Sequence, residues 1–440
     1  MSAAFPHKTG IILAAIAVLL IVAAFVLPVL LDANRYRAQV IAFLEASTGK
    51  KAELGRLRVT FFPKLVVHAE GLGIRSPPLF PPGHFLKVAR IDAQLDLWAL
   101  LHRRVVILSL VLDEPVLNLI SDPDGPWNFE NPKAKNKLNS PILGVVPLVK
   151  IKHAHVLVSN LLPNDAPGPV FFEAQDLSTE MDDVNADAIT DPFSKTLDGK
   201  GSLTAALLRF GSIEAKNLSA DIRLQARQVL FENLKAETYG GHTSGKFSIR
   251  LAGKNASFKT DATMKGIDVA ELLKAFPKAS GKMTGKMEGQ LKMGGEIAHT
   301  EHPLDGLYGS GHLTVRNGQV PSLKLNANLM KLAHYNDLGP AKDDPSSFNM
   351  ISTDLELDHD RISSKVIDID GYGVDVDGSG SVSLIGDAEL DYQGIAQIAS
   401  QGFITNMFAR LAGGTLKDGK LLFPFRIKGT LDNPIFVRGK

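Results

Sequence analysis

The chain has 440 residues, with 48 Lys and Arg against 47 Asp and Glu and a formal net charge of +1 at pH 7. This balance lacks the basic footprint of a nucleic-acid-binding protein, so no nucleic-acid partner is expected. The sequence contains no cysteine, which excludes disulfide bonds, thiolate metal sites and cysteine nucleophiles.

An apolar run without a charge extends from Ile11 to Leu31. As a helix it rises about 1.5 Å per residue, enough to cross a hydrocarbon core of roughly 30 Å. A cleaved signal peptide is the alternative, but its apolar region is usually about 7–15 residues long and ends in a small-x-small site. The Ala-x-Ala at Ala15 comes too early for such a site. The run therefore predicts a transmembrane anchor over residues 1–31.

The charges that flank the run favour a cytoplasmic location for the C-terminal part of the chain. Lys8 precedes the run, whereas Arg35, Arg37 and Lys50 follow it. Counting Lys and Arg alone places the large C-terminal part in the cytoplasm. Long domains, however, cross membranes largely regardless of flanking charge, so this count leaves the orientation open.

The segment after the anchor predicts a helix. Asp32 is expected to cap it, apolar residues recur at helical spacing from Tyr36 to Leu44, and Gly49 stands where a helix C-terminus favours glycine. From residue 52 the apolar period changes to two, which is typical of half-buried strands. Trp98–Leu101 predicts a single helical turn. The strands expected in this half include Leu65–Ala69, Ile91–Leu97, Val105–Leu112, Val116–Ile120 and Ile151–Val158, with loops at Pro77–Gly83 and Ser121–Pro141.

The second half predicts many short strands separated by glycine or by Asp and Asn, the pattern of an antiparallel meander. Three helices are expected among them, at Asp268–Ala275, Leu323–Leu338 and Gln397–Leu411. The expected strands are Ser202–Leu208, Leu218–Gln225, Gly245–Leu251, Ser257–Met264, Gly285–Met293, Gly311–Val315, Ser352–Leu357, Ser364–Ile369, Val374–Leu384, Ala388–Tyr392 and Leu421–Ile427.

These elements predict a mainly β fold with a few helices. An N-terminal transmembrane helix is followed by a long curved antiparallel β-sheet, whose apolar face too few helices can cover. We expect this face to form an apolar groove suited to acyl chains, although a closed β-sandwich with a dry core fits the alternation equally well. The expected domains are the anchor at 1–31, an N-terminal β domain at 32–200 and a C-terminal β-groove domain at 201–440.

Motifs for catalysis and metal binding are weak. Asp375–Gly380 resembles the start of a calcium loop, but its twelfth position is Gly386 in place of a bidentate Glu. His153 and His155 alternate on one strand without an evident third ligand. No nucleophile elbow, phosphate-binding loop or dinucleotide motif is present. We therefore expect a protein that is not an enzyme, with no catalytic, cofactor-binding or metal-binding residues and no cofactor.

The order of several motifs along nearly the whole chain resembles the AsmA family of Gram-negative bacteria. Each motif alone is weak, whereas their order and spacing are specific, and residues 132–200 depart most from the pattern. The motifs are Asp32–Arg37, Leu44–Lys50, Phe62–Val67, Leu95–Arg104, Glu114–Leu119, Asp124–Phe129, Gly371–Leu384 and Phe423–Pro434.

The resemblance implies a single-pass protein of the bacterial inner membrane with the bulk of the chain in the periplasm. The family is similar in architecture to the bridge-like lipid transfer proteins. This implies a cell-envelope function in lipid transport along a β-groove and in outer membrane biogenesis. Phospholipids, the inner membrane and outer-membrane or envelope proteins are the implied partners. The alternative is a structural or assembly factor for outer-membrane proteins that carries no lipid.

Six alternating apolar residues near the C-terminus are the candidates for the floor of the groove. The alternation does not decide which parity faces inward, because Leu422 and Pro424 compete with their neighbours. The groove candidates are Val374, Val376, Leu421, Phe423, Phe425 and Ile427.

Overall fold

A computed structural model describes the chain from Ala33 to Gly439, except for residues 103, 123–126, 130–144, 164–165, 186–197, 226–227, 253–254, 277–278, 298–306, 322, 325–327, 329–346, 360, 372–373, 384–387, 400–414, 419 and 431. The anchor expected at 1–31 and the cap expected at Asp32 lie outside the described residues. Within the described part, no helix is long and apolar enough to cross a membrane.

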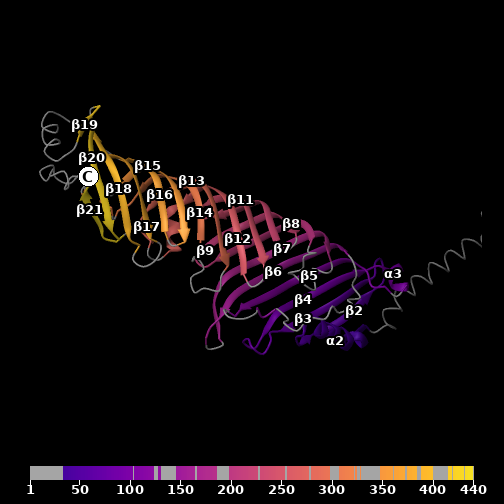
Figure 1. The fold of residues 1–440 in the computed structure, drawn as a ribbon. Helices are drawn as coiled ribbons and strands as arrows, with labels where there is room; N and C mark the ends of the chain where they lie inside the picture. Colours follow the sequence, from indigo (N-terminus) through magenta and orange to yellow (C-terminus); the bar gives the residue numbers. More distant parts are fainter. Residues whose placement is uncertain are drawn as a thin grey trace, which may run out of the picture. The chain divides into compact units, whose positions relative to one another are not determined.

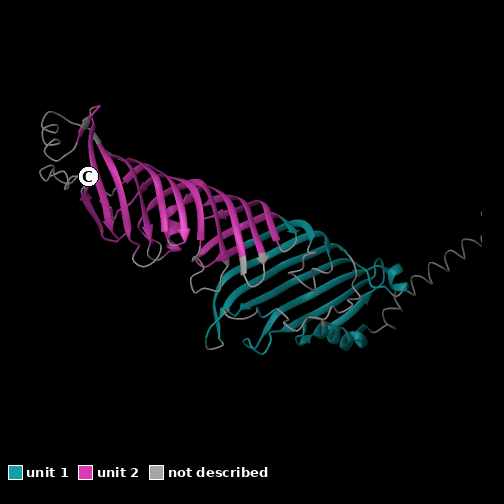
Figure 2. Ribbon diagram, viewed as in Figure 1, with its two compact units in different colours: residues 1–206, 222–227 teal, residues 207–221, 228–440 magenta. Residues whose placement is uncertain are grey.

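The chain divides into two compact units (Figure 2). Unit 1 comprises residues 1–206 and 222–227, and unit 2 comprises residues 207–221 and 228–440. The described strands belong to one 21-stranded sheet, which makes the protein mainly β, as the sequence predicted. A closed sandwich needs a second sheet to cover the first, and the described strands form none. The domain limits expected at residues 31 and 200 stay a prediction.

Unit 1 begins with the predicted helix, which is confirmed as a short 3₁₀ turn η1 (Ala33–Tyr36) followed by α2 (Arg37–Thr48). Gly49 ends α2 with φ 69°, a left-handed conformation that costs a side chain with a Cβ atom. Val40, Ile41 and Leu44 of α2 pack against a buried cluster of strand residues. The helix therefore covers part of one face of the sheet.

The predicted single helical turn of unit 1 is confirmed as α3 (Leu97–Leu101), capped by Asp96. β8 and β9 contribute residues to both units. The strands are β1 (Ala52–Glu53), β2 (Arg56–Thr60), β3 (Val66–Arg75), β4 (His84–Leu95), β5 (Ile107–Ser121), β6 (Val145–Leu161), β7 (Pro167–Asn185), β8 (Asp198–Phe210) and β9 (Ile213–Gln225).

One pairing corrects the prediction of a wholly antiparallel sheet. β5 and β6 are parallel, with Ser109 opposite Leu148 and Ser121 opposite Asn160. Parallel neighbours need a crossover connection, and the long stretch between these strands supplies it. Most of the exposed loop expected at 121–141 lies outside the described residues. Its described part differs from the prediction, because Asn128 is buried and its amide donates to the carbonyl of Asn118 at 2.8 Å.

Unit 2 continues the sheet as an antiparallel succession of strands, which Figure 1 shows in order from magenta to yellow. The predicted helix at Asp268–Ala275 is confirmed as α5 (Val269–Lys274), with Asp268 as its N-cap. The strands are β10 (Gln228–Thr238), β11 (Gly241–Ala252), β12 (Asn255–Asp268), β13 (Thr284–Ile297), β14 (Leu307–Gln319), β15 (Ser347–His359), β16 (Arg361–Gly371), β17 (Val374–Ser383), β18 (Leu390–Ala399), β19 (Thr415–Lys417), β20 (Lys420–Gly429) and β21 (Pro434–Arg438).

Several elements in this half differ from the sequence prediction, which also lacked β19 and β21. The helix expected to begin at Gln397 is wrong at its start, because β18 continues to Ala399 and pairs with β20 there. The rest of that helix and nearly all of the one at 323–338 lie outside the described residues. Strand β10 was not predicted, because a bulge between Phe231 and Leu234 interrupts its alternation.

Candidate functional site

One face of unit 2 carries a continuous row of apolar and small residues across nine strands. Each member of the row lies opposite the next in the strand register, so all lie on the same face of the sheet. At about 4.8 Å between strands, the row is roughly 38 Å long. The row, from β10 to β18, is Phe231, Phe247, Thr260, Met293, Gly309, Leu357, Ile362, Val382 and Leu390.

The neighbouring row in the same strands is polar. It lies one residue along each strand and therefore on the opposite face. Lys292 in this row forms an ion pair with Asp261 at 3.7 Å. The polar row, from β11 to β18, is Lys246, Asp261, Lys292, Ser310, Glu356, Ser363, Ser381 and Asp391. The sheet of unit 2 is thus amphipathic, with one apolar and one hydrophilic face.

The apolar row is half-buried over most of its length. Phe247 has Phe231 and Phe258 as its aromatic neighbours, with ring centroids 5.8 and 6.0 Å away. A depression of about 520 Å³ opens here, with Phe231, Phe247 and Met293 among its lining residues. Side chains of this kind that stay half exposed on a sheet face leave apolar surface available to a ligand.

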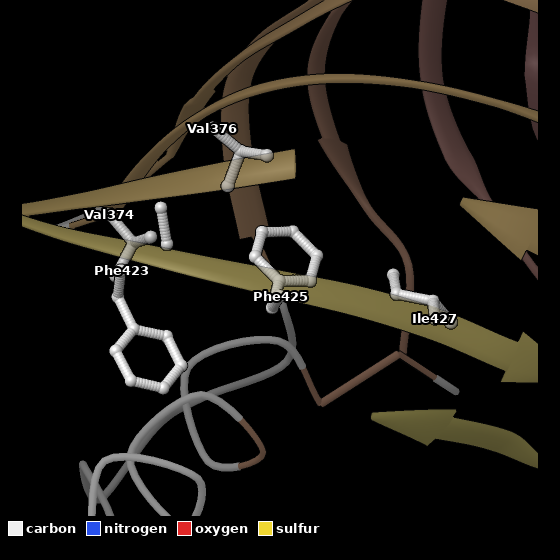
Figure 3. Close-up of a cluster of buried hydrophobic side chains, with 6 residues drawn as sticks. Val374, Val376, Phe423, Phe425 and Ile427 are labelled. Atoms are coloured by element: carbon white, nitrogen blue, oxygen red, sulfur yellow. The ribbon is translucent and has the colours of Figure 1, made fainter. Parts of the chain in front are cut away.

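The six groove candidates are all buried, and five of them form one cluster with Ala396. Figure 3 shows Val374 and Val376 of β17 gathered with Phe423, Phe425 and Ile427 of β20. Leu421 is buried on the same side of β20, since it alternates with the others. The odd-numbered residues of β20 therefore face inward, and Leu422 and Pro424 lie on the other face.

Partly buried residues also pack against this cluster, including Leu323, Tyr392 and Phe436. Gly394 lies opposite Phe425, and a Cβ atom there would meet the Phe425 ring at 3.2 Å, so the absent side chain makes room for the ring. The candidates are thus packed core residues, whereas the half-buried row from Phe231 to Met293 offers the accessible apolar surface. Whether any of the six contacts a ligand stays a prediction.

Strand alternation alone predicted apolar faces in β11 to β13, but it did not single out Phe231, Phe247, Phe258 and Met293. These residues come together only through the register of four strands, and a bulge shifts one of them. The turn glycine at Gly240 is the local signal from which the β10–β11 hairpin and its register could have been found.

Unit 1 has an apolar face of the same kind. Val67, Ala93, Leu110, Val149 and Met181 lie opposite one another across β3 to β7. The opposite face carries ion pairs, among them His68–Asp92 at 2.7 Å, Arg90–Asp113 at 3.1 Å and Lys150–Glu180 at 2.9 Å. The alternation of apolar and charged faces is therefore common to both units.

Side chains of the two motifs considered for metal binding contact other side chains of the protein. His153 and His155 contact different carboxylates, those of Asp176 at 2.6 Å and Glu173 at 2.9 Å. Lys420 donates to Asp375 at 2.9 Å. Among the described residues, no group of three or more His, Asp and Glu side chains is arranged to hold a metal ion.

Two side chains with shifted pKa values, Tyr392 and Asp368, lie on opposite faces of the sheet. Burial on the apolar side raises the pKa of the Tyr392 phenol above its usual range. On the polar side, desolvation and then the hydrogen bond with Asp377 raise the pKa of the Asp368 carboxyl. Burial and hydrogen bonding within the sheet account for both shifts.

The fold and the apolar row define a class: an open β-sheet protein with one continuous, partly accessible apolar face. The model of the AsmA family matches residues 5–165, which include the N-terminal motifs of the sequence, and this match supports the resemblance to that family for this part of the chain. For the motifs from Gly371 to Pro434, which lie outside the match, the resemblance stays a prediction. No curated protein and no solved structure matches the chain.

Proposed function

We propose that the chain binds phospholipid on the apolar face of its sheet and conducts it along that face. In this proposal the chain is anchored in the bacterial inner membrane by residues 11–31, with its bulk in the periplasm. It catalyses no reaction and supports the lipid supply and integrity of the outer membrane. The half-buried apolar row of unit 2 is the observation that carries the proposal.

The movement of lipid in this proposal is passive. An acyl chain lying along Phe231, Phe247 and Met293 leaves water, and each buried CH₂ group contributes about 0.8 kcal/mol. The row consists of apolar or small residues over nine strands, so an acyl chain can move between neighbouring positions along it without meeting a charged side chain of the row. Charged headgroups stay in water at the edge. A face without an energy source only equilibrates lipid, so a direction requires a gradient or a partner.

The first test measures lipid directly. The full chain is purified in detergent, washed, and analysed for bound phospholipid by mass spectrometry. Transfer of a fluorescent phospholipid between vesicles is then measured. We expect phospholipid to be retained and transferred. If the wild-type chain neither retains nor transfers phospholipid, the proposal fails, and the role of an assembly factor without lipid carriage becomes the better account.

A pair of variants tests the apolar row itself. Phe247→Glu places a carboxylate on the apolar face, and Ser248→Glu places the same charge on the polar face one residue further, opposite Lys259. Burying an unpaired charge beside acyl chains costs more than about 1.4 kcal/mol, so Phe247→Glu should lower transfer at least about tenfold. Ser248→Glu should leave it unchanged. Equal transfer by both variants, with unchanged unfolding midpoints, would remove this face as the route.

A further inference from the structure

An exposed apolar patch lies at one end of the sheet of unit 1. We call it the α3 patch: Leu97, Trp98 and Leu101 of α3 together with Phe62 of the β2–β3 turn. Trp98 is 75% exposed, Phe62 73% and Leu101 66%. Large apolar side chains exposed together on this scale mark a contact surface.

The strand order brings the members of the patch together. The β2–β3 turn leads into β3, and α3 follows β4. Both lie at the same edge of the sheet, where these strands begin and end, because the amide of Leu95 at the end of β4 donates to the carbonyl of Leu65 just before β3 at 2.9 Å. The amide of Asp96 donates to the carbonyl of Val106 at 3.0 Å, which fixes the return of the chain after α3. Figure 1 shows α3 at this edge of the sheet. The patch is therefore held by backbone hydrogen bonds.

Basic side chains flank the patch residues in the sequence. Lys64 follows Phe62 in the turn, and His102 and Arg104 follow α3, all three exposed. The ring of His102 contacts the carbonyl of Trp98 at 2.8 Å, which keeps it beside the patch. Tryptophan and leucine with a rim of Lys, Arg and His have the composition of the water–lipid interface, where indole rings lie at the level of the headgroups. Cationic side chains there attract anionic lipids.

The start of the described chain points to the same edge. Asn34 accepts from the amide of Leu57 at 2.9 Å, Arg37 donates to the carbonyl of Leu54 at 2.5 Å, and Glu45 accepts from the amide of Ala52 at 3.2 Å. α2 therefore runs away from the edge that carries the patch, and its N-terminal end faces that edge. Leu57 is three residues from the end of β2, a distance of about 10 Å along the strand.

We propose that the α3 patch docks unit 1 onto an anionic lipid bilayer, the bilayer into which the apolar run Ile11–Leu31 inserts. Trp98, Leu101 and Phe62 enter the headgroup region, and Lys64 and Arg104 contact lipid phosphates. The patch then holds this edge of the sheet at the membrane surface through its own contacts with lipid. This docking does not depend on whether the apolar face of unit 2 carries lipid.

The chain contains two tryptophans, which makes the test direct. Trp127 is half-buried and bridges to Ser121 at the C-terminal end of β5, whereas Ile107 at the start of β5 pairs with Leu95 just before α3. The full chain is reconstituted into vesicles that contain phosphatidylglycerol and brominated phospholipid. In the Trp127→Phe variant only Trp98 fluoresces, and in Trp98→Phe only Trp127. We expect bromine to quench Trp98 at least about twofold more than Trp127, because an indole at the interface lies within reach of the brominated chains.

Two further measurements make the result decisive. In the Trp127→Phe background, Leu101→Asp should reduce the quenching of Trp98, and replacing phosphatidylglycerol with phosphatidylcholine should reduce it as well. The unfolding midpoint of each variant shows that the fold is kept. Quenching of Trp98 no greater than that of Trp127, with emission typical of water, would overturn the proposal and leave the patch to a protein partner. Phospholipid transfer, measured on the same samples, reports separately on the proposed function.

Discussion

Phe425 of β20 stacks on Phe436 of β21, with ring centroids 6.1 Å apart and planes inclined by 24°. Phe425 is 3% exposed, whereas Phe436 is partly buried at the side of the cluster. β21 pairs only with β20 among the described strands, so this aromatic contact helps to close the C-terminal end of the sheet.

The cluster around Phe425 predicts a large loss of stability on truncation. Phe425→Ala should lower the free energy of unfolding by about 3–5 kcal/mol, because it removes buried apolar surface and leaves a cavity. Chemical denaturation measures the loss. Ile395→Ala in neighbouring β18 is the control, since Ile395 is 45% exposed on the opposite face, and its effect should stay below about 1 kcal/mol. Equal losses would show that the Phe425 cluster is not the core of this region.

The end of α2 predicts a backbone effect at Gly49. Its φ of 69° lies in the left-handed region, where a residue with Cβ costs about 1–2 kcal/mol. Gly49→Ala should therefore lower the free energy of unfolding of the chain by about that amount, as measured by denaturation. Gly49→Asn should lose less, since Asn tolerates this conformation better. A neutral Gly49→Ala would mean that α2 can end one residue earlier without cost.

The Asp268 cap of α5 predicts a dependence on pH. The amide of Glu271 donates to this carboxylate and Lys286 pairs with it, and these contacts lower the pKa of Asp268 below its ordinary value near 3.8. Since the folded pKa is the lower one, the stabilisation is present above pH 3.8 and is lost as the pH falls through the folded pKa. Thermal unfolding from pH 6 down to the acid range checks this.

Two substitutions of Asp268 distinguish the effect of its capping hydrogen bond from the effect of its charge. Asp268→Asn keeps an acceptor for the amide of Glu271 and loses the titration, so the acid part of the stability profile should flatten. Asp268→Ala removes both and should cost about 0.5–2 kcal/mol at pH 6. A pH profile of Asp268→Asn that matches the wild type would assign the acid dependence to other carboxylates.

The buried Asn128 leads to a prediction of how much the segment between β5 and β6 contributes to the stability of the protein. It is 0% exposed, its backbone amide donates to the carbonyl of Ile120 at 2.9 Å, and its Oδ1 atom accepts no hydrogen bond from the residues that the structure describes. Asn128→Ala removes the side-chain bond to Asn118 and should destabilise the protein by about 1–3 kcal/mol. Hydrogen exchange should then show faster exchange of the Asn128 amide. Unchanged exchange would show that the backbone bond alone holds the segment against β5.

Local patterns predicted the elements whose signals are short in range. The Asp268 cap, Gly49 and the two-residue alternation each arise within one turn or one strand, so α2, α5 and most of the longer strands follow from the sequence. The Asp96 cap of α3 was not predicted, because Asp96 continues the alternation of the preceding strand. β10 was missed because Asn233, with φ 51°, lies within a bulge that shifts the alternation. The start of the helix expected at Gln397 was wrong because pairing with β20 keeps that segment extended.

The amino-acid sequence alone was enough to predict that the chain is mainly β and that its strands have one apolar and one polar face, and its N-terminal motifs match the AsmA family model. The three-dimensional structure was needed to show that β5 and β6 are parallel, that Phe423 and Phe425 face inward and Pro424 does not, and that Phe231, Phe247 and Met293 line one row. The alternation is a property of neighbouring residues and can be read from a short segment. Register and strand order depend on contacts between distant segments, and a shift of one residue exchanges the two faces.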